Sequence, residues 1–141
     1  MQGGQAVSSD AWKDWERKIV AHAQERNLPW ERRLRLGDNH DLLDVDGCLP
    51  GGWLIGAKSI SRGTTFGKKI SGAMDQCDQA LLNLARPAVR DGNGRLIIDS
   101  GGIIPVQVMQ RSGFPVGKAY AVLQYDYLLD LAVERQERSR S

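Results

Sequence analysis

The residues that could do chemistry lie within one short stretch, where an acidic cluster is followed by an apolar run that ends in a lysine. The acids are Asp41, Asp44 and Asp46, and the lysine is Lys58. Carboxylate oxygens are the ligands that Mg²⁺ prefers, and a metal-bound water beside a lysine can attack a phosphodiester. An acid two residues before the lysine would complete such a site, but that position is Gly56. The stretch therefore predicts a phosphodiester-cleaving metal site that lacks one carboxylate.

Short strands are expected to carry these residues in an antiparallel meander. They are residues 32–36, 41–45 and 53–60, with a Gly51-Gly52 turn before the third. Because residues two apart on a strand share a face, position 56 and Lys58 lie on the same side of the sheet. Asp41 and Asp44 precede them on the neighbouring strand, and neighbouring strands of one sheet can present an acid and a lysine together.

Helices are expected before and after the meander. Apolar side chains recur at helical spacing over residues 9–26 and again over residues 66–86, where the run stops before a proline. Glu16 falls within the apolar stripe of the first helix. A carboxylate directed into the core needs a partner, so two interpretations are open: an ion pair with an arginine such as Arg33 or Arg35, or a role at the metal site.

The C-terminal half is expected to extend the sheet and to add a helix. Strands are expected over residues 95–99 and 103–109, and Pro105 favours an edge position for the second, because proline cannot donate to the ladder. A last helix is expected over residues 118–134. The fold class is thus α/β (α+β): a helix, a three-strand meander, a helix, a strand, and then an appended C-terminal helix.

The length of 141 residues, 41% of them hydrophobic, suffices for one compact core. We expect one domain over residues 10–134, preceded by a linker or cut end over 1–9 and followed by a charged flexible tail over 135–141. The formal net charge of +2 gives no global nucleic-acid footprint, so phosphate contact needs a local patch. The candidates for that patch are Arg62, Lys68 and Lys69.

Composition also excludes several kinds of protein. The two cysteines lack paired spacing and are expected to be free thiols or small core residues, and two histidines are too few for a histidine-rich metal site. No apolar run reaches the length of a membrane span, and the first residues lack the basic and apolar regions of a signal peptide. We therefore expect a soluble domain.

The order of elements and the acid-then-lysine pattern resemble the PD-(D/E)xK, or restriction-endonuclease-like, nucleases from Trp12 to Asp99. The resemblance implies an endonuclease that depends on Mg²⁺ or Mn²⁺. It makes Asp41 the first choice for the acid of the second strand and Asp44 the second choice. Asp46 is third, since Asp46-Gly47 is typical of a turn.

The same resemblance implies roles for residues outside the acidic cluster. Lys58 matches the motif lysine, Glu16 the glutamate that many members carry on the first helix, and Gln76 the glutamine on the helix after the motif. Gly56 departs from the pattern, because it occupies the position of the motif Glu or Asp. The chain is therefore expected to be nearly inactive as written.

Within that family, a compact domain of this kind is similar to the C-terminal toxin domains of contact-dependent inhibition systems and other polymorphic toxins. That resemblance implies cleavage of tRNA, which we favour, or of DNA. It also implies delivery to the cytoplasm of a neighbouring bacterium as part of a larger secreted effector, and neutralisation by a cognate immunity protein. Loss of the carboxylate at Gly56, natural or engineered, would let cells make an otherwise lethal enzyme.

Two other functions are open. If Gly56 is native, the chain is a non-catalytic nucleic-acid- or protein-binding module on a decayed nuclease fold, with Lys58 and Arg62 in contact with phosphate. If the chain is a metal-free ribonuclease, His40 acts as the general base. Binding of Mg²⁺ or Mn²⁺ would distinguish a nuclease from the binding module, and insensitivity to EDTA would indicate the ribonuclease.

Overall fold

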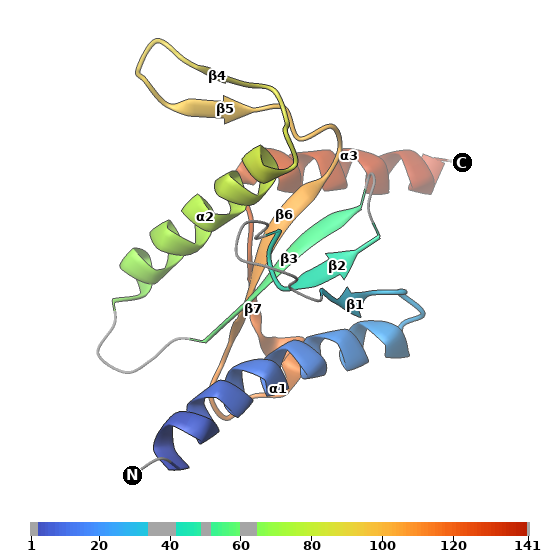
Figure 1. Cartoon of the computed structure of the whole chain (residues 1–141). Helices are drawn as coiled ribbons and strands as arrows, with labels where there is room; N and C mark the ends of the chain where they lie inside the picture. Colours follow the sequence, from blue (N-terminus) through green and yellow to red (C-terminus); the bar gives the residue numbers. More distant parts are fainter. Residues whose placement is uncertain (1–2, 34–41, 49–51, 60–64, 141) are drawn as a thin grey trace.

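The computed structural model describes residues 3–33, 42–48, 52–59 and 65–140, with side chains from residue 13 onward (Figure 1). In this part of the chain a five-stranded sheet lies between two helices, and a third helix and a two-stranded hairpin extend from it. The fold class is therefore mixed α and β, as the sequence predicts. No described helix is both long and apolar enough to span a membrane.

The sheet has the strand order β1-β2-β3-β6-β7. Its strands are β1 (Glu31–Arg32), β2 (Val45–Gly47), β3 (Trp53–Ser59), β6 (Ile104–Gln110) and β7 (Tyr120–Val122). The first three form an antiparallel meander, β6 pairs parallel to β3, and β7 is antiparallel to β6 at the other edge. A parallel pair needs a crossover, and here the crossover contains helix α2 (Phe66–Asn83).

Two apolar cores, one on each face of the sheet, hold α2 and helix α1 (Gly3–Glu25). The α1 core contains Trp15, Ile19, Val45, Ile55, Ala57 and Val106, and the α2 core contains Leu43, Leu54, Cys77, Ala80, Leu81 and Ile103. Ile55 and Ala57 therefore point toward α1. Because side chains alternate along a strand, positions 54, 56 and 58 of β3 point toward α2.

A separate hairpin of β4 (Ala88–Arg90) and β5 (Leu96–Ile98) projects from the body (Figure 1). Its turn is held by Asp91, whose Oδ1 accepts hydrogen bonds from the N–H groups of Asn93 and Arg95. The strand expected over residues 95–99 thus exists, but it belongs to this hairpin rather than to the main sheet.

The edge position expected for the strand over residues 103–109 is wrong, because β6 lies inside the sheet between β3 and β7. Pro105 is tolerated because of the direction of its nitrogen. The Ile104 N–H donates to the Gly52 carbonyl at 3.0 Å on the β3 side, so the nitrogen of Pro105 points to the β7 side. There β7 pairs only with residues 107–109, so Pro105 interrupts no ladder hydrogen bond.

Element boundaries near the N-terminus also differ from those expected. Helix α1 begins at Gly3 rather than at residue 9, so most of the expected linker is helical. Strand β1 starts at Glu31 rather than at residue 32 and ends before Arg33, and residues 34–36 lie outside the described residues. Strand β2 starts at Val45, since residues 42–44 are described and are not in a strand. The late start of β2 has a local cause, since Leu43 has a left-handed φ of 71° that interrupts an extended strand.

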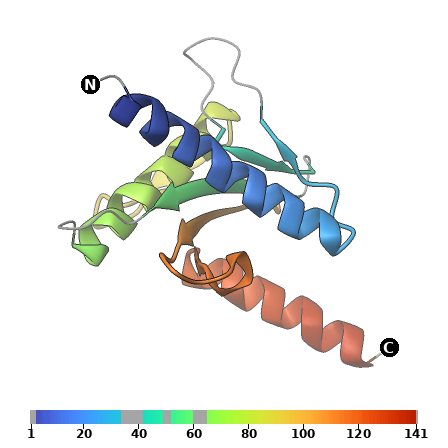
Figure 2. The ribbon, with the colours of Figure 1, turned by 90° about the horizontal axis from the view of Figure 1, so that it is seen from below.

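The last helix, α3 (Tyr125–Arg140), starts and ends later than expected. The residues before it form a 3₁₀ turn, η1 (Val116–Lys118), and strand β7, whose pairing with β6 overrides the helical pattern. The tail expected to fray from residue 135 is helical to Arg140, and arginines in the last turn suit the negative end of the helix dipole. Figure 2 shows α3 extending away from the sheet.

Candidate active site

The β2–β3 register brings Asp44 to the strand that carries Lys58. In this register Asp46 lies opposite Leu54, so two residues earlier in the chain Asp44 lies level with Gly56. Lys58 follows on the same face of β3 as Gly56. The second choice for the acid, position 56 and the predicted lysine are therefore neighbours at one place on the sheet.

Asp44 is fixed to β3 by both its side chain and its backbone. Its side chain is buried, and Oδ2 accepts a hydrogen bond of 2.7 Å from the Ala57 N–H. Its own N–H donates to the Ile55 carbonyl at 2.9 Å, and its carbonyl accepts from the Arg33 N–H at 3.0 Å. The carboxylate is thus held immobile beside positions 56 and 58, as a preorganised catalytic or ligand group would be.

The carboxamide of Gln107 fills the space where a side chain at position 56 would begin. Gln107 lies opposite Gly56 in the parallel β3–β6 pair and is fully buried. A Cβ atom built on Gly56 would lie 1.8 Å from Oε1 and 2.5 Å from Cδ of Gln107. The amide is held by α2, since Nε2 donates to the Ala73 carbonyl at 2.9 Å. An acid at position 56 therefore requires Gln107 to move.

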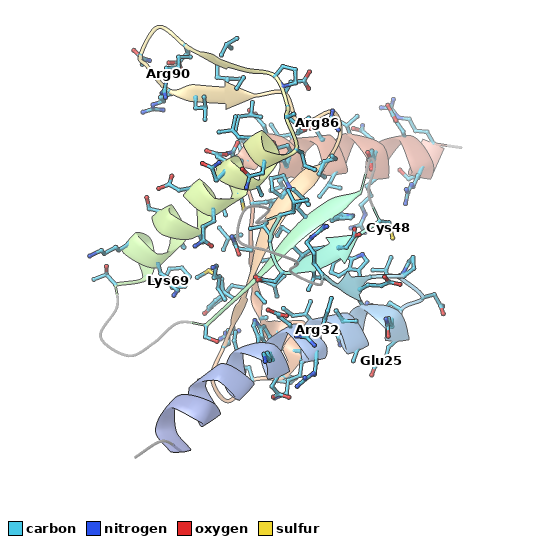
Figure 3. All side chains as sticks on the ribbon, viewed as in Figure 1. Glu25, Arg32, Cys48, Lys69, Arg86 and Arg90 are labelled. Carbon is cyan, nitrogen blue, oxygen red and sulfur yellow. The ribbon has the colours of Figure 1, made fainter. Side chains whose placement is uncertain are left out.

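A cavity of about 590 Å³ opens between β3 and the first half of α2. The described residues that line it are Lys58, Thr65, Lys68, Lys69, Gly72, Ala73 and Gln76. Lys69 is labelled in Figure 3 beside the first turns of α2. The described lining of the cavity contains three lysines and no acid, so the cavity attracts anions.

The start of α2 adds to the positive potential of this cavity. A helix N-terminus carries a partial positive charge and unpaired N–H groups, which acidic side chains usually offset. Helix α2 has no acid in its first turn, and its N-cap residue Thr65 makes no side-chain capping hydrogen bond. Two lysines, Lys68 and Lys69, follow within that end of the helix. This arrangement is electrostatically unfavourable alone and becomes favourable when an anion such as phosphate binds.

Glu16 lies on the other side of the sheet, in the face that α1 buries. Its side chain is 2% exposed, and Oε1 accepts a hydrogen bond of 3.1 Å from Nε of Arg32. The ion-pair interpretation is therefore confirmed, although the described partner is Arg32 rather than Arg33. Lys58 lines the cavity on the α2 side, so the structure does not bring Glu16 and Lys58 together.

The other predicted residues divide between the site and its surroundings. Gln76 lines the cavity with Lys58, as the resemblance implies. Asp46 caps a turn instead, since its Oδ1 accepts from the Cys48 N–H at 3.0 Å. Asp41, Arg62, Arg35 and His40 lie outside the described residues.

The cysteines are free, with Cys48 exposed and Cys77 buried on α2. Burial raises the pKa of Cys77 to about 12; a hydrogen bond with Gln107 lowers it, the charge of Asp78 raises it, and the charge of Lys58 lowers it. Cys77 is therefore a neutral thiol at physiological pH. It is neither an activated nucleophile nor a thiolate ligand.

The two thiols are expected to differ in reactivity. In the native protein at about pH 8, a thiol-specific chromogenic reagent should modify Cys48 at once and Cys77 only after denaturation, because reaction needs an exposed thiolate. The measurement is the number of thiols modified per chain before and after addition of denaturant. Cys48→Ser should remove the fast thiol, and two fast thiols in the unsubstituted protein would contradict the burial of Cys77.

The described residues do not fit a magnesium site. Among them no group of three His, Cys, Asp or Glu side chains lies close enough to hold a metal ion. Asp44 supplies one carboxylate, and position 56 supplies none. Asp41 lies outside the described residues, and Glu16 lies on the other face of the sheet, so neither adds a described carboxylate beside Asp44.

Gln107 is a residue of the site that the sequence did not predict. The available signal was a single polar residue inside the apolar strand Ile-Ile-Pro-Val-Gln-Val-Met, which is unusual in a strand covered on both faces. Its pairing with Gly56 could not be inferred, because a parallel register depends on the crossover rather than on a turn.

No family model matches the chain, and comparisons with curated proteins and with solved structures found no significant similarity. The function is therefore argued from the geometry of the site.

Proposed function

We propose that this chain is a metal-dependent nuclease domain of the restriction-endonuclease-like type, and that Gly56 leaves it nearly inactive. The observation that carries the proposal is the convergence of Asp44, position 56 and Lys58 beside a cavity lined by lysines. A buried, fixed carboxylate on the strand next to a lysine that lines an anion-attracting cavity suits a phosphodiester substrate.

The strand order supports this type of core. Helix α1, an antiparallel meander, helix α2 and a strand parallel to β3 occur in this order along the chain, with the β4–β5 hairpin inserted after α2. The parallel strand is β6 and not the strand over residues 95–99 that the resemblance implied. The meander brings the acid to the strand of the lysine, and the crossover brings the cationic end of α2 to the same face. The fold thus assembles, from separate segments, the groups that a phosphodiester needs.

Each residue of the site has a role in the proposed reaction. Lys58 neutralises charge that develops on the scissile phosphate, and Lys68 and Lys69 hold the neighbouring backbone. Asp44 is the carboxylate of the second strand. A magnesium ion would supply an activated water once a second acid is present. With Gly56 this chain binds the backbone of nucleic acid and cleaves it very slowly.

The substrate class and the biological setting are also proposals. We favour tRNA over DNA, with delivery into a target bacterium and a cognate immunity protein as inhibitor. Expression of a chain with an acid restored at position 56 should arrest bacterial growth, whereas this chain should not. Unimpaired growth despite a soluble, cleaving variant would count against the toxin setting without affecting the nuclease proposal.

A second function, a binding module without catalysis, is favoured by one observation. The Gln107 amide already occupies the space beside Gly56, so the present side chains pack without a carboxylate. In that case the lysine-lined cavity binds phosphate and nothing is cleaved. Both functions predict binding of nucleic acid, and only the nuclease gains metal-dependent cleavage when an acid is restored.

Binding is tested by neutralising the cavity. Lys68→Ala/Lys69→Ala is expected to weaken binding of fluorescent tRNA and to reduce the slope of log K against log salt by about 1 to 2, because each phosphate contact contributes roughly one unit. Fluorescence anisotropy between about 50 and 200 mM salt measures both quantities.

The matched control is Lys13→Ala/Lys18→Ala, which removes the same charge from the exposed face of α1. Lys18 there pairs with Asp14, and α1 packs on the other face of the sheet from the cavity. Equal losses in the two double variants would mean that binding follows net charge, and the cavity would then not be the binding site.

A further inference from the structure

The buried carboxamide of Gln107 is only half satisfied. Its Nε2 donates to the Ala73 carbonyl at 2.9 Å, and its hydrogen bond with Cys77 lowers the pKa of that thiol, which is the effect of a donor. Its Oε1 is buried and has no hydrogen-bond partner among the described residues. That oxygen points at the α-carbon of Gly56, which has nothing to donate. A buried acceptor without a donor destabilises the folded state. In its present position the Gln107 side chain therefore lacks the hydrogen bond that a buried amide oxygen normally accepts.

Nothing in the backbone requires glycine at position 56. Its φ lies outside the left-handed region, so the conformation is one that any residue adopts. The atoms that a Cβ would meet belong to the far end of a flexible side chain, namely the Gln107 carboxamide. The obstacle to a larger residue at this position is thus a group that can rotate.

A cavity beside Gln107 can receive the displaced carboxamide. Its hydrogen-bond partner Ala73 lines the cavity that also contains Lys58 and Gln76. A small rotation toward that cavity keeps Gln107 on the α2 face and frees the space above Gly56. An acid at position 56 would then lie on the same face as Lys58, with the Gln107 N–H groups beside it.

We infer that Gln107 is the residue that positions an acid at position 56, and that in this chain its carboxamide has taken the place of that acid. This inference rests on the proposed nuclease function. With Glu at position 56, Nε2 donates a charge-assisted hydrogen bond to the carboxylate and fixes its direction toward Lys58 and Asp44. Gln107 is thus a positioning residue that acts through position 56.

The packing part of the inference is tested by a double-mutant cycle on the free energy of unfolding. Gly56→Ala should raise the unfolding equilibrium constant about tenfold while Gln107 is present, because the new methyl group displaces the carboxamide and destabilises the fold. In the Gln107→Ala chain the same substitution should change it by no more than about twofold. Equal effects in the two chains would overturn the inference, because the carboxamide would then not occupy the site.

The positioning part is tested with Gly56→Glu and Gly56→Glu/Gln107→Leu, which keeps the size of the side chain and removes its N–H donors. Titration calorimetry with Mn²⁺ should show at least about tenfold weaker binding by the double variant, as is typical when a group that orients a ligand is removed. The kcat for cleavage should fall with it, whereas the KM for nucleic acid should not, because the lysines are intact.

The matched control is Gly56→Glu/Gln110→Leu. Gln110 lies on the same strand but alternates to the α1 side, where it accepts a hydrogen bond from Ser59 at 3.0 Å. This variant should bind Mn²⁺ within about twofold of Gly56→Glu. Thermal unfolding of all variants shows whether a loss of binding is only a loss of folded protein.

The outcomes separate the two proposals. If Gly56→Glu gains Mn²⁺ binding and cleavage, and Gln107→Leu leaves both unchanged, the nuclease proposal stands and the positioning role is wrong. If Gly56→Glu gains neither, the nuclease proposal fails, and the positioning role fails with it even when the packing cycle shows coupling.

Discussion

Gly56→Glu is expected to raise Mg²⁺-dependent cleavage by this chain at least about 10²-fold, the usual value of one preorganised catalytic group. Asp44 and Lys58 are already in place beside position 56, and an extended backbone there accepts a side chain. The added acid gives the described part of the site its second carboxylate, and magnesium keeps several waters and needs few protein ligands. Initial rates on tRNA and plasmid DNA, with Mg²⁺, Mn²⁺ or EDTA, measure the gain and identify the substrate.

Gly56→Gln is the matched control for this gain. Glutamine has the same shape as glutamate and displaces the Gln107 carboxamide in the same way, but it brings no negative charge to a metal. The two variants should therefore have similar melting temperatures and very different rates. If both stay as inert as the unsubstituted chain while folding normally, the nuclease proposal is wrong and the binding module becomes the better explanation.

The central elements of the fold could be predicted because their apolar patterns are strong. Strand β3 and helix α2 begin at the expected residues, since an unbroken apolar run and a clear helical stripe leave few alternatives. The errors lie where tertiary pairing decides. Residues 120–122 carry a helical pattern but form β7 because β6 offers an open edge. Pro105 suggested an edge, and the local direction of its nitrogen made an internal position possible.

Sequence could predict those residues of the candidate site that lie on a single strand or helix with a clear apolar pattern. Lys58 and Gln76 line one cavity, together with the two lysines of α2, because the strand and helix that carry them were placed correctly. The place of Asp44 beside position 56 was not predictable, since it depends on the bend at Leu43 that sets where β2 begins. Gln107 reaches the site only through the parallel pairing of β6 with β3, and no local pattern encodes that pairing.

Asp44→Asn in the Gly56→Glu chain is expected to lower cleavage at least about 10²-fold. Asparagine keeps the volume of the side chain and an oxygen that can accept the Ala57 N–H, so the hydrogen bond of 2.7 Å has a replacement. What it removes is the negative charge that would face the metal. The fold should therefore persist, which circular dichroism and thermal unfolding can check, while the cleavage rate falls. Asp44→Ala is a poorer test, because it leaves the buried Ala57 N–H unpaired at a cost of about 1–3 kcal/mol.

Comparison with the same substitution at the two neighbouring acids, Asp41 and Asp46, shows which aspartate is the acid of the site. Asp46→Asn should cleave normally, since Asp46 is 37% exposed at its side chain and serves a turn and the Arg33 ion pair. Asp41→Asn is measured in the same background. A chain that is inactive as Asp41→Asn and active as Asp44→Asn would show that the buried carboxylate of Asp44 serves only to hold β2 against β3. The opposite result would make Asp44 the acid of the site, because its hydrogen bond to β3 fixes the carboxylate beside position 56, where a second acid shares a face with Lys58.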